Sequence, residues 1–260
     1  MMQDYAGIST DIVSALRLKN SPISICFADS VPAGVGAPAS RVPAGCRFWE
    51  DAMSDSFATS AADHSRCAIG VYTHNLEPSA AQQADLMDAI KVFGDLGYVR
   101  PDDLPLIPVL QSKPRHVLYS PLASTPLPPD VVLLFADAAQ TLILSEATQQ
   151  VEGGNAPAMG RPACAVVPQV MNTGKAAMSL GCCGARAYLS LLTDSISLFA
   201  FPGAHIESYA ERIVTLASAN SVLSKFHRIR REEIYAGHNP TIQDSLESMA
   251  ASSRDAGSPQ

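Results

Sequence analysis

Apolar residues along the chain recur with the periods of helices and of strands in turn. The helical period is clearest over 80–96, where Leu86, Ile90, Phe93 and Leu96 would form one apolar stripe. Further helices are predicted over 8–18, 46–53, 138–149, 184–192 and 205–217. Short apolar or alternating runs predict strands over 22–28, 116–119, 131–136, 163–167 and 196–201. Because strands and helices interleave, the pattern predicts an α/β or α+β protein, with a mixed sheet and flanking helices.

A weak internal repeat bears on how the chain is organised. Residues 26–29 (Cys-Phe-Ala-Asp) resemble residues 134–137 (Leu-Phe-Ala-Asp), and the Arg-Cys-Ala around Cys67 resembles the segment around Cys164. Recurring strand–helix order without duplication would give the same echo, so both interpretations stay open. We expect one globular domain over 1–236, with two weakly related halves at about 6–100 and 114–218. Residues 237–260 are small and polar, which predicts a flexible tail.

Composition and charge narrow the class of protein. The 260 residues are 47% hydrophobic and 17% charged, which supplies enough apolar side chains for one large core. The formal net charge of −7 argues against nucleic-acid binding, and the basic run 225–231 precedes two glutamates, as on a solvated helix face. No apolar stretch reaches the length of a membrane span, and the first residues lack signal-peptide features. We therefore expect a cytoplasmic protein that binds neither nucleic acid nor membrane.

Two segments place a thiol beside a positive charge. In residues 63–67, Cys67 follows Arg66 and stands three residues after His64. Residues 179–186 read Ser-Leu-Gly-Cys-Cys-Gly-Ala-Arg, with Cys182 just before a predicted helix. Backbone N–H groups and the dipole at a helix start lower a thiol pKa, which favours a nucleophile or a metal ligand. None of the six cysteines forms a Cys-x-x-Cys pair, so zinc-ribbon and thioredoxin signals are absent.

A set of motifs follows a fixed order along the chain. They are Pro22-Ile23-Ser24-Ile25, Cys46, His64-Ser65-Arg66-Cys67, Pro129-Asp130-Val131-Val132, Cys164, Ser179-Leu180-Gly181-Cys182-x-Gly184-x-Arg186 and Phe201-Pro202-Gly203. This order resembles the domain of unknown function 169 family of prokaryotes, over about residues 12–216. The resemblance implies no activity. It implies that the family's characteristic cysteines are Cys46, Cys67, Cys164 and Cys182, and that Cys26 and Cys183 are additional.

Four separated cysteines predict a metal centre if the fold brings them together. Cys46, Cys67, Cys164 and Cys182 would then ligate an iron–sulfur cluster or zinc, because a cluster needs thiolate ligands but no fixed sequence spacing. The arginines near Cys67 and Cys182 would offset the thiolate charge. The predicted function is a cysteine-dependent metalloprotein with a redox or small-molecule role. Its predicted partner is a small anionic molecule or a redox partner.

Two other functions fit the same residues. In the first, Cys182 or Cys67 is the nucleophile of an enzyme that acts on a small acyl or thiol substrate, with His64 as the partner base. In the second, the chain is a non-enzymatic module that binds a small anion at a helix start. The anion-binding residues would be Gly181, Gly184, Arg186 and Arg66.

Overall fold

The structure is a computed structural model that describes residues 3–39 and 41–255, with side chains described as far as residue 251. It divides into two compact units, Met1–Ile213 and Val214–Gln260. The first unit contains all six cysteines. The boundary lies inside the long helix α8 (Ile206–Tyr235), which differs from the expected end of the globular domain at residue 236.

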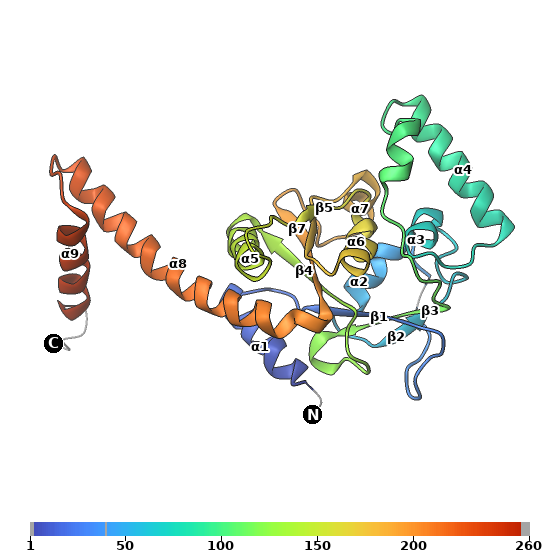
Figure 1. Cartoon of the computed structure of the whole chain (residues 1–260), viewed down its shortest axis with the longest axis horizontal. Coiled ribbons are helices and arrows are strands. Elements are labelled where there is room, and N and C mark those ends of the chain that lie inside the picture. The colour runs from blue at the N-terminus through green and yellow to red at the C-terminus, as the bar shows by residue number, and fades with distance from the viewer. Residues whose placement is uncertain (1–2, 40, 256–260) are drawn as a thin grey trace. The chain divides into compact units, whose positions relative to one another are not determined.

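A seven-stranded mixed sheet forms the centre of the first unit (Figure 1). Its strands are β1 (Ile23–Ala28), β2 (Phe57–Thr59), β3 (His116–Pro121), β4 (Val131–Asp137), β5 (Ala158–Met159), β6 (Ala177–Ser179) and β7 (Ile196–Pro202). Their order is β2-β3-β1-β4-β7-β6-β5. The β5–β6 pair is parallel, and the other neighbouring strands are antiparallel. This mixed sheet confirms the predicted α/β class.

The three strands nearest the centre of the sheet follow the same order on each side, and β5 adds a fourth strand to one side. Strands β1 and β4 pair with each other in the middle. Outward from β1 come β3 and then β2, and outward from β4 come β7 and then β6. Within each set of three strands, both neighbouring pairs are antiparallel. The two sets are therefore related as two like halves.

The register of the strands repeats as well. Ile23 at the start of β1 pairs with Pro121 at the end of β3, and Val131 at the start of β4 pairs with Pro202 at the end of β7. The residue after each proline donates its N–H to the carbonyl just before the paired strand, at 2.8 and 2.9 Å. The repeat thus spans 22–122 and 130–203, whereas we expected 6–100 and 114–218. The sequence pattern misplaced β3 because a long insertion separates it from the rest of its half.

Helices flank the sheet on both faces (Figure 1). In the first half they are α1 (Tyr5–Leu16), η1 (Gly45–Arg47), α2 (Phe48–Asp51), α3 (Ala68–Thr73), α4 (Ala80–Asp95), η2 (Pro101–Leu106) and η3 (Leu122–Ser124). In the second half they are α5 (Ala138–Val151), η4 (Ala163–Ala165), α6 (Val166–Thr173), α7 (Cys183–Tyr188) and η5 (Gly203–His205). The predicted strand over 163–167 is wrong, because those residues form η4 and the start of α6. A short apolar run carries no period that separates a strand from a buried helical turn.

Helix α4 begins with a capping box, in which the Ser79 hydroxyl accepts from the Gln82 N–H and the Gln82 side chain accepts from the Ser79 N–H. Its predicted apolar stripe is buried only in part, since Leu96 at its C-terminal end is 76% exposed. Together with η2, the helix forms the insertion that separates α3 from β3 (Figure 1).

The second unit contains the C-terminal part of α8 and helix α9 (Ile242–Asp255). The Ser245 and Ser248 hydroxyls donate to the Glu233 carboxylate at 3.3 and 2.8 Å, which joins the two helices. Thr241 and Asp244 exchange side-chain hydrogen bonds with each other's N–H and cap α9. A helix therefore occupies most of the segment that we expected to be a flexible tail. The small polar side chains of this segment gave no clear helical pattern in the sequence, and the cap formed by Thr241 and Asp244 marks where the helix begins.

Candidate functional site

Each of the four characteristic cysteines lies at the start of a helix. Cys46 is in η1, which leads into α2, and Cys164 is in η4, which leads into α6. Cys67 is the N-cap residue of α3, and Cys182 is the N-cap residue of α7. In the structural repeat, Cys46 corresponds to Cys164 because they precede the matching strands β2 and β6, and Cys67 corresponds to Cys182 because they follow those strands. The sequence echo had matched Cys67 with Cys164 instead.

The four helix starts meet across the two halves. Turn η1 of the first half contacts α7 of the second, and η4 of the second half contacts α3 of the first. The Thr73 hydroxyl, at the end of α3, donates to Cys164 Sγ at 3.4 Å. These contacts bring a thiol-bearing turn of each half against a thiol-bearing helix of the other.

Electrostatic interactions link every pair among the four thiols. Burial raises the pKa of Cys46, Cys67 and Cys164, and repulsion by the other thiolates raises each of them further. These repulsions connect Cys46 with Cys67 and Cys182, Cys67 with Cys182, and Cys164 with the other three. The four thiols therefore lie near enough to one another to interact electrostatically.

The two remaining cysteines lie elsewhere. Cys26 is buried with Ala58 and Leu118 in a small cluster separate from the main core, and its thiol lies near the carbonyls of residues 127 and 128. Cys183 is exposed. Neither takes part in the interactions that connect the four thiols, so both are suited to serve as control positions.

Backbone N–H groups face Cys67. The Gly70 N–H donates to Cys67 Sγ at 3.3 Å, and the hydrogen bond from the Gly45 backbone also favours the thiolate. A Cβ atom at residue 70 would come within 3.1 Å of the same sulfur, and one at residue 45 within 2.4 Å of His64 Nδ1. Both glycines thus allow a backbone approach that a side chain would obstruct.

His64 is buried beside this approach, at 1% exposure. Its Nε2 lies 3.0 Å from the Thr59 hydroxyl, which donates to the Val117 carbonyl at 3.3 Å. Because that hydroxyl's proton is used, Nε2 carries the proton of the neutral ring and Nδ1 is left as an acceptor. Nδ1 has no hydrogen-bond partner among the described residues. Burial lowers the pKa of His64 to about 4.

Tyr119 also faces the thiols, and the sequence analysis missed it. Its hydroxyl is buried and makes no hydrogen bond of ordinary geometry in the part of the chain that the structure describes, but the Thr59 side chain lies close enough to lower its pKa by hydrogen bonding. Burial raises its pKa, and the thiolates of Cys67, Cys164 and Cys46 raise it further. The one available signal was a tyrosine at an inward position of the strand predicted over 116–119.

Arg186 is engaged by the loops around it. Its guanidinium donates to the backbone carbonyls of Leu180, Leu192, Thr193 and Ile196. Gly181 adopts a φ of +87°, and a Cβ there would come within 2.7 Å of Leu192. A Cβ at Gly184, in α7, would meet no atom closer than 3.8 Å. Two members of the predicted anion site, Arg186 and Gly181, therefore shape the loop that holds Cys182.

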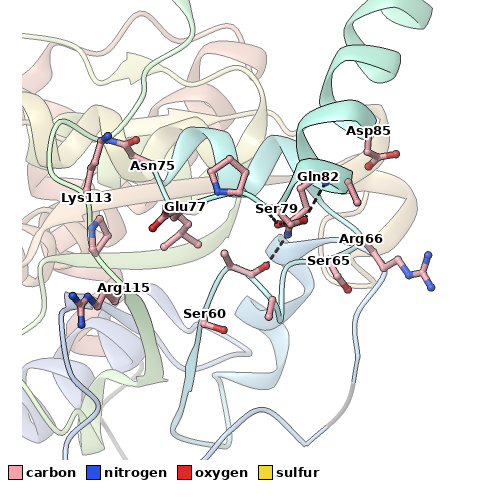
Figure 2. Close-up of a pocket in the computed structure, with 16 residues that line it drawn as sticks. Ser60, Ser65, Arg66, Asn75, Glu77, Ser79, Gln82, Asp85, Lys113 and Arg115 are labelled. Carbon is pink, nitrogen blue, oxygen red and sulfur yellow. Dashed lines mark hydrogen bonds between the residues drawn. The ribbon is translucent and has the colours of Figure 1, made fainter.

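Arg66, the fourth member, is exposed and lines a groove with a volume of about 1340 Å³ (Figure 2). Figure 2 shows Lys113 and Arg115 on one side of the groove and Arg66 and Asp85 on the other. One wall is the loop 60–66, which the Gln82 side chain fixes by donating to the Ala61 carbonyl at 2.7 Å. That loop ends one residue before Cys67, but none of the four cysteines lines the groove.

Fold and site together define the class, an α/β protein in which two like halves bring four thiol-bearing helix starts near one another. A family model matches residues 11–212, and the chain belongs to the DUF169 family, which is described as Uncharacterised ArCR. This match confirms the resemblance seen in the motifs. No curated protein and no solved structure matched the chain.

Two features are absent from the residues that the structure describes. No group of three or more His, Cys, Asp or Glu side chains is arranged there so that it could hold a metal ion. Nor does any helix in those ranges combine the length and the apolar character needed to span a membrane.

Proposed function

We propose that Cys46, Cys67, Cys164 and Cys182 bind an iron–sulfur cluster and that the protein has a redox role. The observation that carries this proposal is the mutual approach of four thiols from four helix starts. Four thiolates in one buried volume repel one another unless a cation is bound among them, and a bound metal reverses the balance that keeps these thiols protonated. A bound cluster would supply one-electron transfer.

The surroundings of the thiols offer hydrogen-bond donors to such a group, and binding it would require the four described thiols to move from their positions in this structure. The Gly70 N–H and the Thr73 hydroxyl already donate to two of the sulfur atoms, which stabilises negative charge on them. Hydrogen bonds of this kind, together with a buried apolar shell, set the reduction potential of a cluster. Zinc bound by four cysteines uses the same ligands, and the metal content of the protein separates the two.

Anaerobic purification and reconstitution test the proposal. We expect a brown protein with stoichiometric iron and acid-labile sulfide. Cys182→Ser and Cys46→Ser should lose both, whereas Cys26→Ser and Cys183→Ser should keep them. A colourless anaerobic protein without iron, or equal iron loss from the Cys26→Ser control, would contradict the proposal; stoichiometric zinc would support a structural metal site instead.

A cysteine nucleophile is the second candidate, and the unpartnered Nδ1 of His64 beside Cys67 favours it. Burial opposes it, because the raised pKa of Cys67 keeps the thiol protonated near neutral pH. Iodoacetamide labelling of the folded, metal-free protein distinguishes the two candidates. Rapid selective labelling of Cys67 or Cys182 would favour the nucleophile; labelling that begins with exposed Cys183 is the result expected for cluster ligands.

We further propose that the groove beside the loop 60–66 receives a small anionic molecule. Arg66, Lys113 and Arg115 line it, and no ion pair of theirs occurs among the described residues, while Glu77 and Asp85 supply two opposing charges. Citrate, as a probe, should bind more weakly to Arg115→Gln and Lys113→Gln in calorimetric titration. The control is Arg100→Gln, whose side chain pairs with Asp103 instead. Equal affinities in all four proteins would refute an anion site.

A further inference from the structure

Cys182 and Cys183 are two thiols that the covalent structure itself holds together. They are consecutive in the chain, so their Cα atoms lie about 3.8 Å apart. Cys183 is exposed and Cys182 is half-buried, so a reagent in solution reaches Cys183 first. Cys182 is the N-cap residue of α7, but its side chain makes no capping hydrogen bond. Both thiols are free and can react without removing a cap from the helix.

The segment around this pair is anchored at both ends. Before it, the Ser179 hydroxyl donates to the Gly160 carbonyl at 2.8 Å and accepts from the Gly181 N–H at 3.1 Å. After it, the Arg186 guanidinium donates to four backbone carbonyls of the surrounding loops. Residues 182–184 can therefore rearrange while the side chains on either side hold the loop in place.

A bond between the two sulfur atoms requires such a rearrangement. Cys182 is extended, with a φ of −138° and a ψ of 171°, and successive side chains of extended backbone point to opposite sides. A disulfide needs Cβ atoms about 3.5–4.5 Å apart, so the peptide between the two cysteines must rotate. The Cys182 carbonyl accepts from the Arg186 N–H at 2.9 Å and closes the first turn of α7, and the rotation breaks this hydrogen bond. Gly184 leaves room for the movement, since even a Cβ there would meet no atom closer than 3.8 Å.

We propose that Cys182 and Cys183 form a reversible vicinal disulfide in the metal-free protein, and that this bond opens the first turn of α7. The oxidant is a low-molecular-weight disulfide. The Cys183 thiolate attacks one of its sulfur atoms and displaces a thiolate, and the Cys182 thiolate then attacks Cys183 Sγ and displaces a second thiolate. The two cysteines lose two protons and two electrons, and the oxidant is reduced to two thiols.

The geometry of the pair explains why the bond is reversible. Adjacent Cα atoms lie closer than the roughly 4.4–6.8 Å of ordinary disulfides, so the closed ring is strained. Strained and exposed disulfides are reduced more readily than structural ones, which suits a bond that responds to the redox state of its surroundings. The inference goes beyond the proposed function, because a cluster bonded to Cys182 would protect the pair from oxidation.

Oxidised glutathione, added to the metal-free full chain, tests the pair. Tryptic cleavage after Lys175 and Arg186 releases a peptide that contains Cys182, Cys183 and no other cysteine. We expect this peptide to become lighter by two hydrogen atoms and to carry no glutathione. Cys182→Ser should instead retain glutathione on Cys183, because the second thiol that would displace it is missing. Cys26→Ser is the control and should behave like the parent.

Amide hydrogen exchange tests the opening of the helix. Exchange in α7 should be faster in the oxidised parent than in the reduced one, and dithiothreitol should restore the slower rate, while α5 should exchange alike in both. Glutathione that stays on Cys183 of the parent, or a disulfide from either residue to another cysteine, would refute the pair. A vicinal disulfide with unchanged exchange in α7 would refute the opening of the turn.

Discussion

The paired rings of His64 and His74 should make the metal-free protein sensitive to mild acid. Both rings are fully buried and lie with their centroids 6.2 Å apart. Burial lowers the pKa of His64 to about 4, and burial with repulsion from His64 lowers that of His74 to about 3. In the unfolded chain both titrate near pH 6.5. Below that pH the two imidazoles bind protons in the unfolded state but not in the folded state, so the free energy of unfolding falls as the pH decreases.

The magnitude follows from this difference in proton binding. Between pH 7 and pH 5, each unfolded imidazole gains about 2 kcal/mol of protonation free energy, while the folded rings remain neutral. The two rings together should cost about 4 kcal/mol of stability, out of the 5–15 kcal/mol typical of a folded domain. Above about pH 7 their contribution should be constant.

Urea unfolding of the metal-free protein at pH 7, 6 and 5 measures this loss. His74→Phe removes one titrating group but keeps an aromatic ring beside Phe27, whose ring centroid lies 5.7 Å from that of His74. The variant should therefore lose about 2 kcal/mol less than the parent between pH 7 and 5. The exposed His205 provides the control His205→Gln, which should keep the parental slope. A parental slope in His74→Phe would refute the reasoning.

Two further substitutions test the packing of the sheet. Gly203→Ala should destabilise the protein by about 1–3 kcal/mol, because the added Cβ would come within 1.7 Å of the Pro129 carbonyl oxygen. The control is Gly36→Ala, whose Cβ would meet no atom within 4 Å, and this variant should melt like the parent. Cys26→Ser should cost no more than about 1–2 kcal/mol, because the serine hydroxyl can still donate to the nearby backbone carbonyls, and a larger loss in thermal melting would show that the thiol packs more tightly than its contacts indicate.

Much of this architecture could be predicted from local patterns. The alternation of strands and helices gave the α/β class, and the order of the motifs singled out the four cysteines that the fold brings together. Strands such as β4 and β7 are long apolar runs between turn residues, which makes their pattern distinctive. The glycines beside Cys182 indicated a close backbone approach, and Gly181 has the positive φ that favours glycine.

Other features depend on contacts that no local pattern encodes. The correspondence of Cys67 with Cys182 emerges from strand register, because the insertion containing α4 obscures the repeat in the sequence. Arg186 was expected to bind an anion, yet its position among loop carbonyls depends on how the chain folds back after α7. Tyr119 could not be selected from the sequence, because its place near the thiols depends on how β3 packs against elements distant in the sequence.

The centre of the sheet, where the two halves meet, is held by few residue pairs, so a group bound at the thiol site would help to hold the halves together. Strands β1 and β4 join the halves through three residue pairs, whereas β1 pairs with β3 over six and β4 with β7 over seven. Two of the four thiols come from each half, so a group bonded to all of them would act as a cross-link over this seam. Its binding energy would then add to the cohesion of the halves. Extraction of the group by a chelator or by oxygen would loosen the seam, and faster amide hydrogen exchange in β1 and β4 would report that release.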